Sequence, residues 1–233
     1  AMGYRLSLVE DSPRQENVVR LKVDTSLNDQ LGSEGYRLEA TTRSVVISAA
    51  EPAGLFYGIQ TLRQLLPPAI FRVQKAAPPR GLGPAALEVE GAQWTVPCVR
   101  ITDYPRFKWR GLLIDPARHF IPREDVERFI DTMALHKFNR LQIHLTDDQG
   151  WRIEIKKHPQ LTEIGAKMDL TTILRGGGAD NEAGGQRPGG YYTQDEIRQM
   201  VRYAAEHYVT IIPEIEMPAH TGAAIVSYPH LAL

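Results

Sequence analysis

Cysteine is almost absent from this 233-residue sequence, in which Cys98 stands alone. A single cysteine excludes an internal disulfide framework, and it leaves the cellular compartment open because bacterial secreted proteins without disulfides are common. An excess of charge of either sign is also missing, since 27 Lys and Arg balance 28 Asp and Glu to a net charge of -1. We therefore expect no nucleic acid and no anionic membrane surface as a partner, because no overall field would attract them.

Long apolar runs are absent too. No stretch reaches the roughly 18 residues that a membrane span needs, so we expect no spanning helix. The opening Ala1-Met2-Gly3 resembles an expression remnant more than a targeting signal, and any native signal peptide is expected to have been removed. What the sequence does have is 42% hydrophobic residues, which is enough to build one large domain or two small ones.

The first hundred residues combine strand and helix patterns. Short alternating apolar stretches are separated by Asn, Asp, Gly and Ser, which is typical of strands and turns. The segment "EPAGLFYGIQTLRQLLPP" has apolar side chains at helical spacing, with Pro52 suited to a first turn and Pro67-Pro68 to an end. We predict a small α+β domain over residues 1–101, in which an antiparallel sheet packs against a helix. A Pro- and Gly-rich loop at 75–86 follows the helix within this domain. The expected strands are 4–9, Val18–Val23, Tyr36–Ala40 and 45–48.

From Arg110 onward the rhythm is strand, helix, strand, helix, strand. A helix is expected to begin at Pro122, and a second one at Thr193, where Glu196 three residues later completes a capping box. Short continuously apolar strands that alternate with amphipathic helices indicate parallel β/α units buried on both faces. Residues 102–233 therefore begin either an open doubly wound sheet or a TIM (β/α)8 barrel. The strands are expected within "RGLLIDPAR", "NRLQIHLTDDQGW" and "VTIIPEIEMPAH".

One segment, "RGGGADNEAGGQRPGG" at 175–190, is rich in glycine. Its glycines do not lie between a strand end and a helix start in either phosphate-loop pattern, and no Gly-Lys-Ser follows. We interpret it as a surface insertion rather than a phosphate-binding loop.

Each of the three predicted parallel strands ends in polar side chains. Because the carboxyl ends of parallel strands form one rim, we expect groups that are distant in sequence to converge there. The groups are Asp115, Arg118 and His119 after the first strand, His144, Asp147 and Asp148 at the second, and Glu214, Glu216 and His220 at the third.

Simpler interpretations exist for each group. Asp147 or Asp148 can cap a turn, as can Asp115, and Arg118 can be a surface cation. His144 lies among apolar neighbours and is expected to support the interior rather than to catalyse. A metal set of Glu214, Glu216, His220 and Asp147 is conceivable, although its spacing is not diagnostic of any known site.

Four blocks of sequence together resemble glycoside hydrolase family 20, the β-N-acetylhexosaminidases, from about Tyr36 to the last residue. They are "AGLFYGIQTLRQLLPP", "WRGLLIDPARHF", "ALHKFNRLQIHLTDDQGWRIEIKKHPQLTEIGA" and "GGYYTQDEIRQMVRYAAEHYVTIIPEIEMPAH", and they occur in the family's order. The resemblance implies a small α+β domain before a (β/α)8 barrel, of which this chain would hold the first three β/α units. It also implies a carbohydrate substrate with a terminal N-acetylhexosamine, no metal and no cofactor, and it favours a periplasmic or secreted location.

The resemblance assigns roles to three residues. Arg118 in "DPARHF" matches the residue that binds hydroxyls of the terminal sugar. Asp147 in "LTDDQGW" and His220 in "EMPAH" match an Asp and a His that hydrogen-bond in series behind the catalytic acid, and we expect them to be catalytic. The chain departs from the usual family pattern mildly, at Leu141, Gln142 and Ala219, and none of these departures touches the three assigned residues.

The family's reaction is substrate-assisted, with the acetamido carbonyl of the sugar as nucleophile. Its Asp-Glu pair follows the fourth strand, and no matching pair is found before Leu233, because "EDVE" and "TQDE" belong to helices. We therefore expect a second polypeptide, either the other half of a nicked enzyme or a separately encoded piece, to complete the barrel, and this chain alone to be inactive. Two alternatives stay open, a noncatalytic sugar-binding remnant and a metal-dependent barrel hydrolase.

Overall fold

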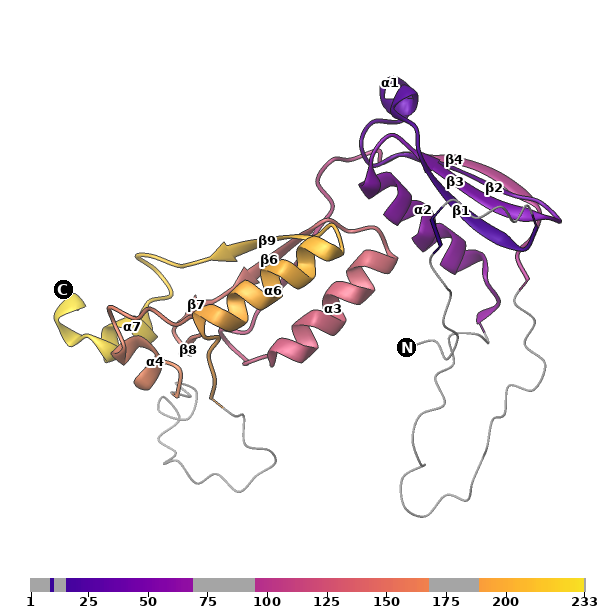
Figure 1. Ribbon diagram of the computed structural model, residues 1–233. Coiled ribbons are helices and arrows are strands. Elements are labelled where there is room, and N and C mark those ends of the chain that lie inside the picture. The colour runs from indigo at the N-terminus through magenta and orange to yellow at the C-terminus, as the bar shows by residue number, and fades with distance from the viewer. Residues whose placement is uncertain (1–8, 11–15, 69–94, 168–188, 233) are drawn as a thin grey trace, which may run out of the picture. The chain divides into compact units, whose positions relative to one another are not determined.

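The computed structural model describes residues 9–10, 16–68, 95–167 and 189–232, and the chain forms two compact units, Ala1–Arg106 and Phe107–Leu233 (Figure 1). Three predicted segments lie wholly or mostly outside the described residues: the strand at 4–9, the loop at 75–86 and the glycine-rich segment at 175–190.

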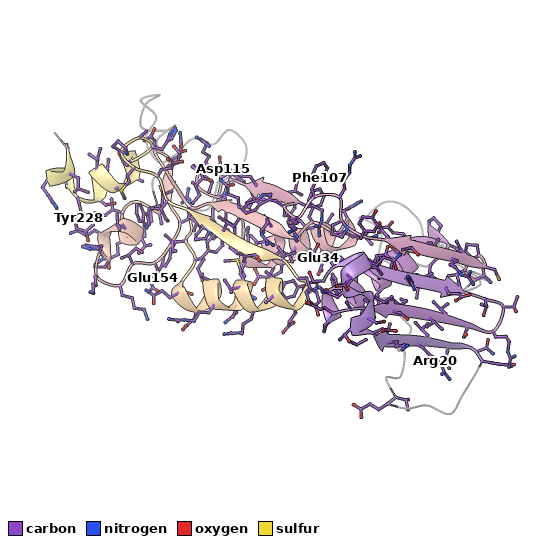
Figure 2. The ribbon with its side chains drawn as sticks, turned by 90° about the horizontal axis from the view of Figure 1, so that it is seen from above. Arg20, Glu34, Phe107, Asp115, Glu154 and Tyr228 are labelled. Atoms are coloured by element: carbon purple, nitrogen blue, oxygen red, sulfur yellow. The ribbon has the colours of Figure 1, made fainter. Side chains whose placement is uncertain are left out.

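The first unit contains a four-stranded sheet in the order β1-β3-β2-β4 (Figure 2). The predicted strands at 18–23, 36–40 and 45–48 are all present. The prediction of a purely antiparallel sheet is wrong, because β1 pairs parallel to β3, whereas β2 is antiparallel to both β3 and β4. The parallel pair arises because β3 inserts between β1 and β2, which are linked by η1 (Thr25–Leu27) and α1 (Asn28–Leu31). The strands are β1 (Val18–Val23), β2 (Tyr36–Ala40), β3 (Ser44–Ala49) and β4 (Val99–Asp103).

Strand β4 has no counterpart among the predicted strands. The domain boundary expected after Ile101 falls within it, and Thr102 and Asp103 still pair with β2. The hydroxyl of Tyr36 donates to Oδ2 of Asp103 over 2.8 Å, which adds a side-chain link between β2 and β4. The first unit consequently extends to Arg106.

Helix α2 (Pro52–Leu65) packs on this sheet. The alternation of β2 and β3 buries one face of each strand, including Leu38 and Ile47, which are both fully buried. The helix approaches closely at Gly58, where an added Cβ would lie 2.4 Å from Cγ2 of Ile47. This contact explains why the apolar face of the helix contains a glycine at that turn.

The second unit contains a parallel three-stranded sheet in the order β5-β6-β9, made by β5 (Gly111–Ile114), β6 (Arg140–His144) and β9 (Thr210–Glu214). Helices α3 (Arg123–Leu135) and α6 (Gln194–Glu206) lie side by side over it, and their apolar faces share one core with Leu141 and Ile143 of β6 (Figure 1). The expectation of burial on both faces is wrong for β5, where Leu113 is 53% exposed. Within the described residues the two long helices cover one face of the sheet, so the other face stays open.

The predicted capping box at the start of α6 is confirmed. The amide of Glu196 donates to Oγ1 of Thr193 over 3.1 Å, and the amide of Thr193 donates to Oε2 of Glu196 over 2.8 Å. These two bonds satisfy donors that the helix start would otherwise leave unpaired.

Short elements extend the carboxyl ends of the strands. They are β7 (Thr146–Asp147), β8 (Gly150–Trp151), α4 (Gln160–Glu163), α7 (Gly222–Ser227) and η3 (Pro229–Leu231). Strands β7 and β8 form a hairpin directly after β6, and α7 follows β9. Among the described residues, no helix has the length and apolar character that crossing a membrane demands.

Candidate active site

Asp147 is the centre of the candidate site and is 1% exposed. Its Oδ2 lies 2.6 Å from Nη2 of Arg118 and 2.9 Å from Nε2 of His144. Its Oδ1 accepts the backbone N–H of Asp148 over 2.6 Å and lies 3.2 Å from Nδ1 of His220. Four partners match the acceptor capacity of an ionised carboxylate. The buried charge is therefore compensated on both oxygens.

The partners of Asp147 come from the ends of all three parallel strands. Arg118 follows β5, the β7–β8 hairpin follows β6, and His220 follows β9. The structure thus brings Arg118, Asp147 and His220 together, although they are far apart in the sequence. Backbone hydrogen bonds join the strand ends themselves, from the amide of Ala117 to the carbonyl of His144 and from the amide of Leu145 to the carbonyl of Glu214.

Arg118 is bound on both sides. Its Nη1 donates to Oδ2 of Asp115 over 2.6 Å, and its backbone amide donates to Oδ1 of the same carboxylate over 3.0 Å. Asp115 therefore holds the loop and the guanidinium at once, and half of the Arg118 side chain, 48%, stays exposed. The hydrogen bond that Arg118 donates to Asp115 is the main reason that the pKa of Arg118 is raised above its ordinary value, against the effect of burial.

Opposing effects act on the pKa of Asp147. Burial alone would raise it, but hydrogen bonds from His144 and the Asp148 amide, with the charges of Arg118 and His220, outweigh burial. The pKa of Asp147 is consequently lower than its ordinary value, and the carboxylate is ionised at neutral pH.

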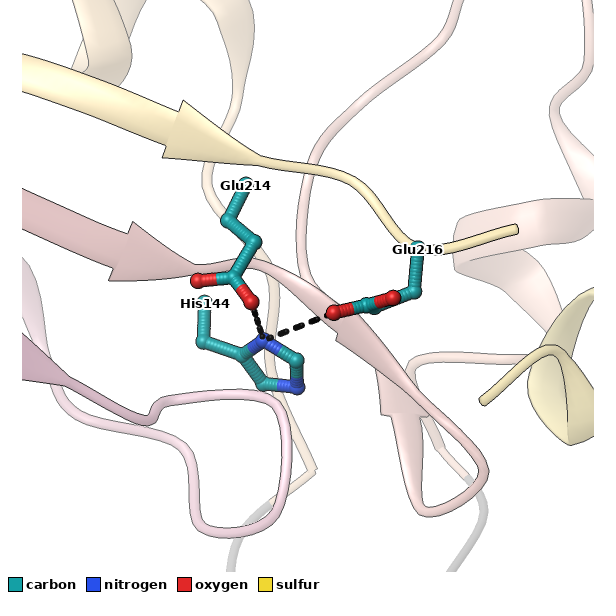
Figure 3. Close-up of side chains that lie close together, drawn as sticks. All are labelled: His144, Glu214 and Glu216. Carbon is teal, nitrogen blue, oxygen red and sulfur yellow. Dashed lines mark ion pairs between the residues drawn. The ribbon is translucent and has the colours of Figure 1, made fainter. Parts of the chain in front are cut away.

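A second cluster lies next to Asp147, around the other nitrogen of His144 (Figure 3). Nδ1 of His144 is 2.9 Å from Oε1 of Glu214 and 3.9 Å from Oε1 of Glu216. The side chain of Gln142 donates to Oε2 of Glu214 over 2.5 Å, and this hydrogen bond is the main reason that the pKa of Glu214 is lowered. Sequence reasoning placed His144 in a supporting role but missed the part of Gln142, for which the only signal was a polar residue inside an apolar strand.

Arg152 was not predicted as part of the site. Its guanidinium is buried and donates to the carbonyls of Pro116, Ala117, Ala166 and Gly190. It thereby joins the loop after β5 to segments that follow β8 and precede α6. In the sequence it is one of three charged positions in the alternating stretch "WRIEIK", so nothing local distinguished it.

Two other predicted site residues, His119 and Asp148, are more exposed than Asp147. His119 is exposed, and the side chain of Asp148 is 48% exposed while its Oδ1 accepts the amide of Gly222 over 2.8 Å. The four possible metal ligands, Glu214, Glu216, His220 and Asp147, do not form a single set. In the part of the chain that the structure describes, they separate into one group of His144, Glu214 and Glu216 and another of Asp147, Asp148 and His220.

Fold and site together define a class: a parallel β/α protein whose ionisable side chains gather at the carboxyl ends of its strands, where such folds bind small molecules. Within this class, residues 107–233 match the catalytic domain of glycosyl hydrolase family 20, and residues 1–104 match domain 2 of the same family. The chain belongs to glycosyl hydrolase family 20.

Named relatives agree with this assignment. The chain is 42% identical over 216 residues to a beta-hexosaminidase of Porphyromonas gingivalis. The aligned region covers 93% of this chain and 24% of the relative. It is 38% identical over 220 residues to a beta-hexosaminidase of Akkermansia muciniphila, covering 93% of this chain and 38% of the relative. A solved structure of a mutant Streptomyces plicatus beta-hexosaminidase in complex with product (GlcNAc) is 40% identical, with a TM-score of 0.77 over 99% of this chain and 40% of that chain. The chain thus spans about a quarter to two fifths of the length of these relatives.

Proposed function

We propose that this chain is part of a β-N-acetylhexosaminidase, a glycoside hydrolase that removes terminal β-linked N-acetylglucosamine or N-acetylgalactosamine. The single observation that carries the proposal is the buried Asp147 carboxylate held between Arg118 and His220, in a chain of this family. Relatives at 42% and 38% identity have the name beta-hexosaminidase, which supports the same activity here.

In this proposal Arg118 binds hydroxyl groups of the terminal sugar. Its guanidinium is half exposed and fixed by Asp115, so it offers donors in a defined direction. Asp147 and His220 act in series behind the general acid. An ionised Asp147 keeps the proton of His220 on Nδ1, and Nε2 is then the nitrogen that can accept a hydrogen bond from the acid.

The proposed reaction is substrate-assisted and retains the anomeric configuration. The acid protonates the leaving oxygen while the acetamido carbonyl oxygen attacks the anomeric carbon and the glycosidic bond breaks. An adjacent aspartate stabilises the acetamido nitrogen, and water then opens the oxazolinium ring. In this scheme the protein supplies proton transfer, charge and orientation, and the sugar supplies the nucleophile.

We also propose that the remaining strands of a (β/α)8 barrel and its Asp-Glu pair come from sequence outside these 233 residues. That sequence belongs either to the same longer chain or to a second polypeptide. Two observations support this. The relatives are much longer than the matched region, and within the described residues β5 and β9 are the edges of the sheet. Beside β9, a hollow is lined by Val201, Ala205, Tyr208, Val209, Thr210 and Ile211, and further elements would pack there.

The test uses the complete protein and nitrophenyl β-glycosides of N-acetylglucosamine and N-acetylgalactosamine. Release of nitrophenol with the β-anomer as first product is expected, unchanged by a chelator. Replacement of the acetamido group by a trifluoroacetamido group should slow turnover steeply, because fluorine withdraws electrons from the attacking oxygen. Binding of N-acetylglucosamine without turnover would instead identify a sugar-recognising protein, and loss of activity on chelation would identify a metal-dependent hydrolase. The mass of the active species in solution should exceed that of the 233-residue chain.

A further inference from the structure

His144 has a carboxylate at each of its ring nitrogens. Nε2 lies 2.9 Å from Oδ2 of Asp147, Nδ1 lies 2.9 Å from Oε1 of Glu214, and the His144 side chain is 6% exposed. We infer that His144 is a positioning residue for the proposed reaction, a doubly protonated ring that holds Asp147 against Glu214 across the ends of β6 and β9. This inference rests on the proposed function for its effect on turnover, and on the geometry alone for the state of the ring.

The two short contacts require two donors. A neutral imidazole has one N–H and one lone pair, so one of its nitrogens would face a carboxylate oxygen with no proton between them. Only the imidazolium donates to both sides. Glu214 cannot turn away easily, because Gln142 holds its other oxygen, and Asp147 is fixed by Arg118 and the Asp148 amide.

The charges around the ring favour the same state. Three carboxylates face it, Asp147 from β7, Glu214 at the end of β9 and Glu216 just beyond, and Asp115 adds a fourth negative charge nearby. On the positive side, Arg118 lies beyond Asp147, and the ring of His220 is centred 6.5 Å away. Burial would lower the pKa of His144, but the hydrogen bonds to Asp147 and Glu214 outweigh burial and raise it.

The spacing in this cluster matches a hydrogen bond more closely than a pair of ligands on a tetrahedral zinc ion (Figure 3). Two ligand atoms on one tetrahedral zinc ion, each about 2.0 to 2.1 Å from it, lie roughly 3.3 Å apart. Nδ1 of His144 and Oε1 of Glu214 are closer, at 2.9 Å, which is the length of an N–H···O hydrogen bond. Glu216, at 3.9 Å, is too far from the ring for a hydrogen bond.

The consequence for the reaction concerns the moment of sugar binding. Arg118 and His144 share Oδ2 of Asp147, and Arg118 is also the proposed sugar-binding residue. When the guanidinium turns toward sugar hydroxyls, His144 remains on Oδ2, so Oδ1 stays directed at Nδ1 of His220. His144 thus keeps the Asp147–His220 pair aligned independently of the substrate.

Two substitutions in the complete protein distinguish the contact of His144 with Asp147 from its contact with Glu214. The amide nitrogen of Gln occupies the place of Nε2, so His144→Gln keeps a donor for Asp147. The amide nitrogen of Asn occupies the place of Nδ1, so His144→Asn keeps a donor for Glu214 only. We expect His144→Asn to lower kcat about 10- to 100-fold with little change in KM, because misplacement of a catalytic group has costs of that size. His144→Gln should lose less, and the pH dependence of kcat should change in both variants.

The matched control is His207→Gln. This histidine also faces a carboxylate, Asp131 at 3.2 Å, but it follows α6 and lies away from the strand ends that form the site. Its variant should keep wild-type kcat and pH profile. His144→Asn kinetics equal to those of His207→Gln would overturn the inference.

A measurement on the unsubstituted protein tests the protonation of His144 without an activity assay. With ¹⁵N-labelled histidine, nuclear magnetic resonance should show protons on both ring nitrogens of His144 at pH 7, the signals being assigned by their loss in His144→Gln. A bare nitrogen on this ring at pH 7 would refute the inference even if turnover is normal. If the protein cleaves no N-acetylhexosaminide, the proposed function fails, and the spectrum still decides the state of His144.

Discussion

Nδ1 of the exposed ring of His220 lies 3.2 Å from Oδ1 of the buried carboxylate of Asp147. The contact joins an inaccessible charge to a side chain that is 45% exposed. Because Asp147 is ionised, it selects the tautomer of His220 that has its proton on Nδ1. A carboxylate in the interior of the protein thereby determines which ring nitrogen of a half-exposed histidine faces inward with its proton.

Asp147→Asn is expected to lower kcat of the complete enzyme by about 100-fold, within the range for an impaired acid–base system. Asn presents an amide nitrogen to donors that need an acceptor, so His220 loses its fixed tautomer. KM should change little, and the pH profile of kcat should shift. Steady-state kinetics against pH measures both, with Asp195→Asn on the exposed face of α6 as the control. Unchanged kcat would remove Asp147 from the reaction.

Arg118→Ala should chiefly weaken binding. Loss of hydrogen bonds from a charged donor, at about 1.5 to 3 kcal/mol each, predicts a rise in KM of at least about 10-fold. The measurement is KM for the nitrophenyl glycoside together with inhibition by free N-acetylglucosamine. Arg202→Ala, an exposed position on α6, provides the comparison. Equal KM values in the two variants would contradict the assigned role.

Much of this architecture could be predicted from the sequence because local patterns determine it. The alternation that buries Leu38 and Ile47 defines β2 and β3, and the Thr193–Glu196 pair defines the start of α6. Pairing direction could not be predicted in the same way. A strand shows the same alternation of side chains whether its neighbour runs parallel or antiparallel, so the parallel pairing of β1 with β3 left no trace in the pattern.

In the candidate site, too, some residues could be predicted from the sequence and others could not. The convergence of Arg118, Asp147 and His220 was expected because each follows a predicted parallel strand. Gln142 was missed because its partner Glu214 is 72 residues away, and Arg152 was missed because its partners are backbone carbonyls. Neither kind of contact creates a local sequence pattern.

Acid should lower the stability of the folded protein partly through protonation of Asp147. Its pKa is lower in the folded protein than its ordinary value of 3.8, so the unfolded chain takes up the proton first. Its contribution to stability is present above pH 3.8 and is lost as pH falls through the folded pKa. The difference in Tm between wild type and Asp147→Asn should therefore shrink as the solution is acidified, as followed by circular dichroism. A constant difference across this range would contradict the lowered pKa.

The contribution of His144 to stability should depend on pH in the opposite direction. Its folded pKa is raised above the ordinary value of 6.5, so its contribution is fully present below pH 6.5 and is lost as pH rises through the folded pKa. Thermal unfolding of wild type and His144→Gln should thus converge toward alkaline pH. A difference in Tm that stays constant with pH would contradict the raised pKa of His144.

Arg152→Lys is expected to lower the free energy of unfolding by about 2 to 4 kcal/mol, because Lys cannot reach all of the buried carbonyls at once. Denaturant unfolding measures the loss, and Arg202→Lys at an exposed position should change stability by less than about 0.5 kcal/mol. An Arg152→Lys variant as stable as that control would show that the carbonyls find other donors.

Two of the carbonyls that Arg152 binds, those of Ala166 and Gly190, stand on either side of residues 168–188. The two flanks also touch directly, since a Cβ on Gly189 would lie 2.8 Å from the carbonyl oxygen of Ala166. One buried guanidinium therefore fixes both flanks of this stretch at a single point beside the loop that follows β5.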